Sequence, residues 1–331
     1  MTIKKYISLS LGISIFFLLA IIFFATFPFL SLNHQDIEIP KVSIENDIEE
    51  YLRIEESKIS NIAPNAKKKI IWNNSDTKEK TEYAFVFLHG VLATGHQHEL
   101  SVRKIADSLG ANLFITRLSG HGVPYEGTKL MKAENLLKDA VEAIEVGSKI
   151  GDKVIVMGFS LGGALMSIVA SDQISSEKLD YLILLAPAHS KFTSTYFMIA
   201  LISFLTGGIE ADYAELYGLD NEWNQYWSTK VDREELHELW KIPNLSDQIG
   251  FQNNEVPLLL FYNNHDAVVP EEGIKKNYKK WKGPKKIYDL NTTEEGPPNH
   301  NLIGIFNPNL DDTFIREINC LLYTSPSPRD S

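Results

Sequence analysis

The stretch Gly158-Phe159-Ser160-Leu161-Gly162 decides the fold of this chain. An apolar run, 154–157, precedes it, and a small-residue segment, 163–168, follows it. This pattern predicts a buried strand, a sharp turn and a helix, with Ser160 at the turn. Gly158 and Gly162 are needed because side chains would not fit beside so sharp a turn. The context indicates a nucleophile elbow, which lifts a reactive serine above the sheet edge, rather than a generic Gly/Ser turn.

A serine nucleophile needs a base, and the base needs a carboxylate to orient it. Where this elbow occurs, the chain order is serine, acid, histidine. The buried run 257–262 ends shortly before Asp266, which places this acid at the carboxyl end of a strand. His300 is the only histidine after that strand loop. We therefore predict a triad of Ser160, His300 and Asp266, with Asp289 as the competing acid.

The chain also offers two candidate donors for an oxyanion hole. A buried strand predicted at 84–88 ends in His89-Gly90-Val91. One donor should be the backbone N–H of Leu161, at the N-terminus of the helix behind the serine, where negative charge is favoured. The other should be the N–H of Val91. We interpret His89 as structural, because with Gly90 it shapes the loop.

At these residues the chain resembles the α/β-hydrolase superfamily, and within it the branch of esterases, monoacylglycerol lipases and serine aminopeptidases. The resemblance covers roughly residues 67 to 302. It implies a Ser-His-Asp hydrolase without a cofactor. One departure is Ser119, which stands where proline is commoner and affects no catalytic position. The matching segments are Phe87–Gly90, Arg117–Gly122, Gly158–Gly162, Asp266 with Val268 and Val269, and His300.

Strand and helix patterns alternate regularly along the middle of the chain. Apolar runs, continuous as in strands covered on both faces, are separated by amphipathic segments. The alternation predicts an α/β fold with a mostly parallel central sheet flanked by helices, in a hydrolase domain over 63–319. The predicted strands are 69–72, 84–88, 113–116, 154–157, 181–185, 257–262 and 286–290.

The alternation breaks at residues 188–255, a segment of 68 residues with no clear strand. Because so long a segment is not a loop in a compact domain, we predict a helical cap inserted between two strands. Its first part, 196–205, is apolar on all sides, and its later part is rich in tryptophan. These side chains either pack the cap onto the core or form an apolar acyl pocket or a lipid-facing surface.

The N-terminal sequence predicts that the protein is directed to a membrane. Two lysines in residues 1–5 precede an uncharged, apolar stretch over 6–32, which is longer than the core of a signal peptide. We predict a cytoplasmic segment 1–5, a transmembrane signal anchor 6–32 and an extracytoplasmic catalytic domain, on the periplasmic or extracellular side. The alternative is a secreted protein, cleaved after Ala20 or Ala25.

Two further segments flank the predicted domain. Residues 33–62 are acidic, and we predict a spacer with a short amphipathic helix, in which Ile48 and Leu52 share a face, that packs loosely. Residues 320–331 end in a Ser/Pro run that resembles a translated sequencing adapter. We predict that they form a non-native tail, which belongs to no packed element and interrupts a final helix opening at Asp311.

Composition excludes several classes of partner. The net charge of −11 argues against a nucleic-acid partner. A lysine-rich segment, 275–286, indicates a solvated helix face more than a patch for anionic membranes. His96 and His98 have a spacing that could hold a metal, but no third ligand is evident, so we predict no metal site. Cys320 is the only cysteine, which excludes an intrachain disulfide.

The sequence therefore predicts a serine hydrolase that cleaves carboxylic esters with medium-chain or lipid-like acyl groups through an acyl-enzyme. A peptidase of the serine-aminopeptidase type would use the same chemistry and remains an alternative. A non-catalytic ligand-binding protein on the same fold is the alternative from another class. The expected partners are a small ester or lipid-like molecule and a membrane.

Overall fold

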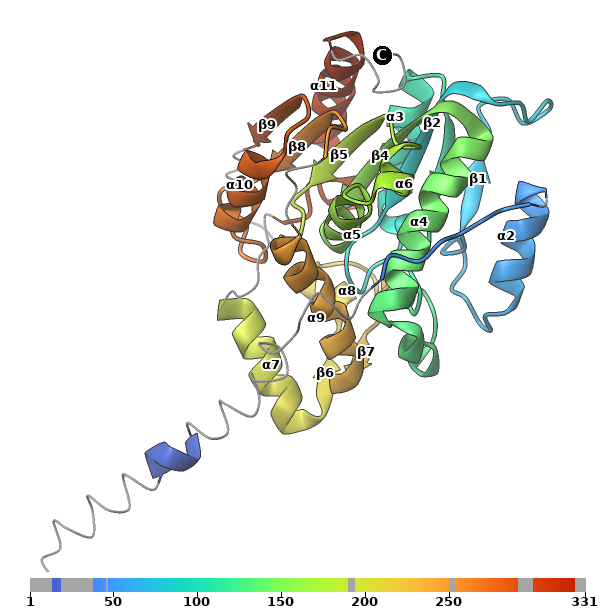
Figure 1. Cartoon of the computed structure of the whole chain (residues 1–331). Helices are drawn as coiled ribbons and strands as arrows, with labels where there is room; N and C mark the ends of the chain where they lie inside the picture. Colours follow the sequence, from blue (N-terminus) through green and yellow to red (C-terminus); the bar gives the residue numbers. More distant parts are fainter. Residues whose placement is uncertain are drawn as a thin grey trace, which may run out of the picture.

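The computed structural model describes residues 14–18, 38–45, 47–189, 194–249, 254–290 and 300–324. In this part of the chain a central sheet lies between two layers of helices. A smaller region of helices lies beneath the sheet in the view of Figure 1.

The sheet has seven strands in the order β1-β3-β2-β4-β5-β8-β9. Every neighbouring pair is parallel except β1 and β3, which are antiparallel. The mostly parallel sheet predicted from the alternation is confirmed. The strands are β1 Lys69–Ile71, β2 Thr81–Leu88, β3 Asn112–Ile115, β4 Gly151–Phe159, β5 Tyr181–Leu185, β8 Leu258–Tyr262 and β9 Lys285–Asp289.

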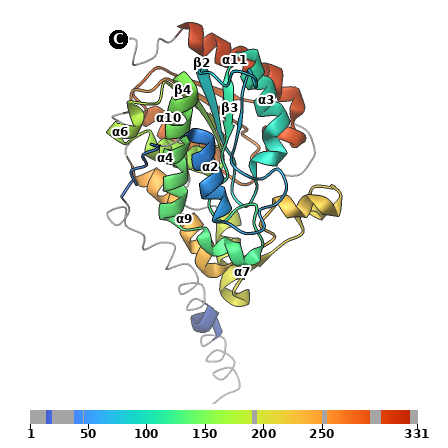
Figure 2. The same ribbon diagram turned by 90° about the vertical axis from the view of Figure 1, so that its right-hand side faces the viewer.

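Side chains of each central strand alternate between two hydrophobic clusters, one on each face of the sheet. On β2, Val86 packs toward α4 and α5, whereas Phe85 and Phe87 pack toward α3 and α11. Figure 2 shows the sheet between α4 on one side and α3 on the other. This is why the strands are continuous apolar runs.

The helices of the main domain are short to medium in length. Four of those that cover the sheet are α3 Glu99–Ser108, α4 Ala133–Ile150, α5 Leu161–Val169 and α11 Asp311–Thr324. The others are α2 Ile48–Ser57, α6 Gln173–Ser176, α10 Glu271–Lys280, and the 3₁₀ turns η2 Gly95–His98, η3 Tyr125–Leu130, η6 Gly304–Phe306 and η7 Pro308–Leu310.

The region predicted as a cap follows β5 and precedes β8. It is mainly helical, but it also contains two short antiparallel strands that the sequence pattern did not predict. Three-residue strands are too short to give a period-two signal, which explains the omission. The described elements of the cap are α7 Ser194–Thr206, β6 Gly208–Glu210, α8 Tyr213–Leu216, η4 Asn221–Tyr226, β7 Lys230–Asp232 and α9 Arg233–Gln248.

The acidic segment 33–62 packs more tightly than expected where it is described. Leu52 of α2 is buried in the main core. Glu56 accepts two hydrogen bonds from Arg117, at 2.7 and 3.1 Å, and both side chains are buried. A bidentate pair of this kind fixes orientation as well as position. The expectation of a loosely packed spacer was therefore wrong for α2.

The C-terminal helix also differs from expectation. α11 does not stop at Asn319 but continues to Thr324, and Leu321 is only 2% exposed, within the cluster on the α3 face. The prediction that residues 320–331 belong to no packed element was thus wrong for 320–324, because apolar side chains continue the helix period. Residues 325–331 lie outside the described part of the chain.

The membrane anchor expected at 6–32 lies almost entirely outside the described residues. Among the residues that are described, no helix is both long and apolar enough to span a bilayer. Residues 1–5 and the cleavage positions Ala20 and Ala25 also lie outside that part.

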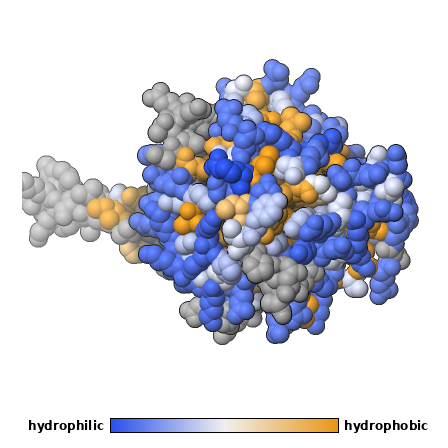
Figure 3. Space-filling view, turned by 90° about the horizontal axis from the view of Figure 1, so that it is seen from above, coloured by the Kyte–Doolittle hydropathy of each residue, from blue (hydrophilic) through white to orange (hydrophobic). Residues whose placement is uncertain are grey.

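The surface seen from above is mainly hydrophilic, with scattered hydrophobic side chains (Figure 3). The lysine-rich segment carries ordinary ion pairs. Lys275 pairs with Glu271 at 2.6 Å and Lys276 with Asp247 at 2.7 Å. These contacts fit a solvated helix face, as the charge pattern indicated.

The burial of Leu321 gives a test of the C-terminal helix. Leu321→Ala should lower the free energy of unfolding by about 2–5 kcal/mol, because it removes a buried side chain and leaves a cavity. Tyr323→Ala is the matched control, since Tyr323 is 89% exposed and its loss should cost less than about 0.5 kcal/mol. Urea unfolding followed by circular dichroism measures both. Equal, negligible effects would contradict the packing of this turn.

Candidate active site

Ser160 occupies a strained turn between β4 and α5. Its backbone angles are φ 52° and ψ −113°, in a region that residues other than glycine rarely adopt. Its N–H donates to Leu185 O at 2.9 Å, and its carbonyl accepts from Ala164 and Ala188. These bonds to β5 and to the segment that follows it hold the turn in place. The side chain is buried, at 3% exposure.

The turn can form because Gly158 and Gly162, two positions to either side of Ser160, have no side chains. A Cβ on Gly162 would lie 2.5 Å from Leu88 O, and one on Gly158 would lie 2.7 Å from Gly162 O. Both distances are far inside van der Waals contact with backbone atoms that cannot move aside. The elbow therefore depends on both glycines, which is why the five-residue pattern was informative.

The structure brings the three predicted triad residues together. His300 Nε2 lies 2.8 Å from Ser160 Oγ, and His300 Nδ1 lies 2.7 Å from Asp266 Oδ2. The Asp266 side chain is 1% exposed and that of His300 is 9% exposed. The serine hydroxyl, the imidazole and the carboxylate thus form one hydrogen-bonded chain, largely shielded from water.

Asp266 is held independently of the histidine. Its Oδ1 accepts the backbone N–H groups of Val268 and Val269, at 2.7 and 2.9 Å. This leaves Oδ2 for His300, so the backbone of the loop sets the direction of the carboxylate. The competing acid, Asp289, instead accepts from the N–H of Asn264 at 3.3 Å.

Both ring nitrogens of His89 form hydrogen bonds with backbone atoms. Nε2 accepts from the N–H of Leu118 at 3.0 Å, so Nδ1 carries the hydrogen and donates to Gly90 O at 2.8 Å. Burial, with a further contribution from nearby His121, holds the pKa of His89 well below its usual range. Burial also lowers the pKa of His121 to about 4. Both rings are therefore neutral near pH 7, and their hydrogen bonds to Gly90, Leu118 and Ser119 hold the loops after β2 and β3.

The two predicted oxyanion donors line the same cavity as Ser160 and His300. Leu161 is the first residue of α5, so its N–H has no acceptor within the helix. Val91 lies in the loop after β2, next to Leu92, whose φ is 59°. The positive end of the α5 dipole faces the same space.

The cavity at Ser160 has a volume of about 220 Å³. One side is formed by the elbow and the loops that carry Val91 and His300. The other side comes from the cap and is almost wholly apolar or aromatic. The cap residues are Ile199, Ile209, Tyr213, Tyr217, Trp227, Leu236, Leu239, Trp240 and Pro243.

The two histidines weighed as metal ligands serve different purposes. His96 packs on the ring of Tyr226, with centroids 4.2 Å apart, whereas His98 packs on Phe87 and Phe159. Within the described part of the chain, no three His, Cys, Asp or Glu side chains cluster in a way that could hold a metal.

Sequence reasoning missed several residues at the site. Phe159 packs on His300, with ring centroids 5.1 Å apart, and Tyr217 of the cap hydrogen-bonds to Asn301. The available clues were the positions of Phe159 next to Ser160 and of Asn301 next to His300. The cap contacts carried no clue, because they depend on how the cap folds over the site.

No protein-family model matches the sequence, and no curated protein matches it. Several solved structures, however, superpose on this chain. A metagenome-derived lipolytic enzyme superposes with a TM-score of 0.59 at 16% identity, over 78% of this chain and 100% of its own. A soluble variant of monoglyceride lipase from Saccharomyces cerevisiae, in complex with a substrate analog, gives 0.57 at 14% identity, over 88% and 98%. Monoacylglycerol lipase from Paleococcus ferrophilus gives 0.55 at 14% identity, over 77% and 98%.

The chain has the α/β-hydrolase fold. The superpositions cover nearly the whole of each of these structures. The fold that the resemblance in the sequence implies is thus confirmed. An α/β-hydrolase fold carries many chemistries, so the activity has to be argued from the residues of the site.

Proposed function

We propose that this α/β-hydrolase-fold protein is a serine hydrolase that cleaves carboxylic esters with medium-chain or lipid-like acyl groups. The observation that carries the proposal is the hydrogen-bonded chain from Ser160 through His300 to Asp266, at 2.8 and 2.7 Å. Each residue is in reach of the atom it must act on. The intact chain argues against a non-catalytic binding protein, which would have no need of it.

The proposed reaction follows the acyl-enzyme route. Ser160 Oγ attacks the ester carbonyl while His300 Nε2 takes its proton, and Asp266 stabilises the imidazolium. The N–H groups of Val91 and Leu161 donate to the oxyanion, each contributing about 10²–10³ in rate. His300 then returns the proton to the leaving alcohol. Water, activated by the same imidazole, hydrolyses the acyl-enzyme and frees Ser160.

The lining of the cavity supports an apolar acyl group as substrate. Its wall on the cap side is aliphatic and aromatic, and burial of apolar area is the main source of affinity for such groups. The described residues that line it include no Asp or Glu. An aminopeptidase would need a carboxylate to hold the charged amino terminus of its substrate, so the ester is favoured over the peptide.

The nucleophile can be tested by covalent labelling. The full chain should react with a fluorophosphonate probe, and Ser160→Ala should not, because no other serine contacts His300 in the described structure. Ser167→Ala is a matched control on the same helix, since Ser167 is fully buried and donates to Gly163 O. In-gel fluorescence reads out all three proteins. Labelling that survives in Ser160→Ala would exclude the assignment.

The acid can be tested by paired substitutions. Asp266→Asn should lower kcat by about 10⁴-fold with little loss of stability, since an amide favours the wrong histidine tautomer. Asp289→Asn should leave kcat nearly unchanged. Steady-state kinetics with a p-nitrophenyl ester, beside thermal unfolding, measures both effects. The reverse pattern would assign the acid to Asp289.

We also propose that residues 6–32 anchor the protein in a membrane with the catalytic domain outside the cytoplasm. The support is the uncharged apolar stretch behind two lysines in the sequence. A reporter fused after residue 62 should be active only outside the cytoplasm, and the protein should resist a high-salt wash of membranes. A mature N-terminus after Ala20 or Ala25 would favour secretion instead.

A further inference from the structure

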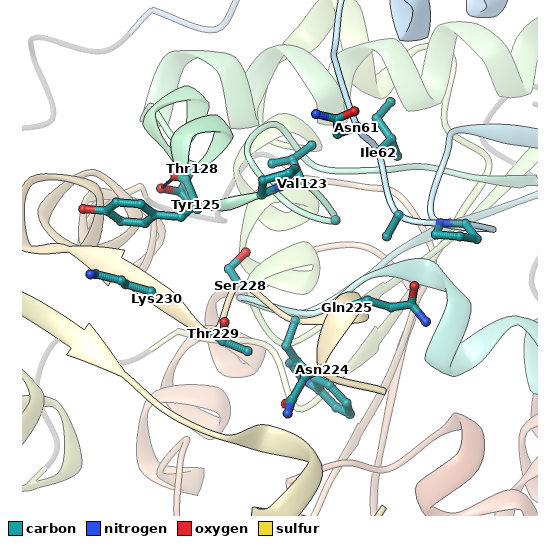
Figure 4. A pocket seen from close by; sticks show the side chains of 15 residues that line it. Asn61, Ile62, Val123, Tyr125, Thr128, Asn224, Gln225, Ser228, Thr229 and Lys230 are labelled. Atoms are coloured by element: carbon teal, nitrogen blue, oxygen red, sulfur yellow. Dashed lines mark hydrogen bonds between the residues drawn. The ribbon is translucent and has the colours of Figure 1, made fainter. Parts of the chain in front are cut away.

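A second cavity, of about 510 Å³, lies where the cap meets the main domain. It is within the size range of small-molecule sites. Three segments line it: 61–64 before β1, 122–128 after β3, and 224–230 of the cap. Figure 4 shows Ser228 and Thr229 of the cap below Val123 of the main domain, with the cavity between them. Trp227 lines both this cavity and the one at Ser160.

The lining of this second cavity mixes polar and apolar groups and is nearly uncharged. Among the described residues, it holds side-chain amides and hydroxyls, one cation, Lys230, and no carboxylate. Lys230 is already placed over the ring of Tyr125, with Nζ 4.8 Å from its centroid. The Tyr125 hydroxyl donates to Asp232, which lies outside the lining. Neither an anion nor a cation would therefore find a matching set of charges here.

Some polar groups of the lining remain available to a ligand. The Ser228 side chain is 3% exposed, and its hydroxyl has no hydrogen-bond partner among the described residues. A buried polar group without a partner is costly, and a bound molecule or water can relieve the cost. By contrast, the Asn224 amide is engaged with Asp212 and Ala214. The available groups are thus hydroxyls and the amide of Gln225, each of which can donate and accept.

We propose that this cavity binds a neutral polyhydroxylated molecule, a monosaccharide or a small polyol. Ligand hydroxyls both donate and accept, so they match amide and hydroxyl side chains better than any charged group would. The aromatic rings of Trp227 and Tyr125 supply apolar surface for the C–H groups of such a ligand. The site is independent of the ester hydrolysis proposed above.

A ligand in this cavity would join the cap to the main domain. Ser228 N–H donates to Leu92 O at 2.8 Å, and Gln97 Nε2 donates to Tyr226 O at 3.0 Å. These bonds already tie the cap segment before β7 to the loop that carries Val91 and to η2. A bound ligand would add contacts between the cap and the main domain. It should therefore raise the thermal stability of the protein by mass action.

The test is isothermal titration of the full chain with glucose, myo-inositol and glycerol, beside inorganic phosphate and choline. At least one neutral ligand should bind, with a Kd on the order of 1 mM, and more tightly than either ion. Ser160→Ala should bind it equally well, which separates this cavity from the catalytic one. Tighter binding of phosphate or choline, no binding of any neutral ligand, or loss of binding in Ser160→Ala would overturn the proposal.

Two variants map the site. Gln225→Leu and Ser228→Ala each remove one polar group, and at least one of them should weaken the neutral ligand about tenfold. Gln173→Leu is the matched control, because Gln173 is exposed on α6, away from the cavity, and should bind normally. Circular dichroism checks that each variant is folded. Unchanged affinity in both folded variants would place the ligand elsewhere and overturn the proposal.

Discussion

The strained backbone of Ser160 is the constraint on which the rest of the site depends. A positive φ at a serine persists only where its surroundings enforce it, and here the bonds to β5 and the close backbone packing at Gly158 and Gly162 do so. The strain holds the hydroxyl 2.8 Å from His300 and sets Leu161 at the start of α5, with its N–H free of helix acceptors. The positions of the nucleophile and of one oxyanion donor thus follow from one turn, and the loops after β8 and β9 bring Asp266 and His300 to it.

Most of this arrangement could be predicted from the sequence, because it depends on local patterns. Continuous apolar runs gave the strands, and the glycines around Ser160 gave the elbow. Asp266 could be preferred over Asp289 because it follows a buried strand by a few residues, the spacing of a loop at the sheet edge. The geometry agrees, since His300 contacts Asp266 at 2.7 Å. The roles of these residues in catalysis, and the anchor at 6–32, remain predictions.

What could not be predicted depends on contacts between segments distant in the sequence. The buried pair of Glu56 and Arg117 joins residues 61 positions apart, and an acidic helix gives no sign of such a partner. The sequence pattern assigns Leu321 to a non-native tail because a Ser/Pro run follows it, although the helix period continues through this residue. The second cavity is formed by three separate segments, none of which has a motif of its own. In each case the information lies in packing rather than in local pattern.

The central claim is that Ser160 is acylated during turnover, and trapping that intermediate tests it most directly. The full chain is mixed with a medium-chain p-nitrophenyl ester, quenched with acid within one turnover, and analysed by intact and peptide mass spectrometry. We predict a burst of p-nitrophenol and one acyl group on the peptide that contains Ser160, with no adduct from an aminoacyl p-nitroanilide. Turnover of the ester without a Ser160 adduct, or with the acyl group on another residue, would contradict the account.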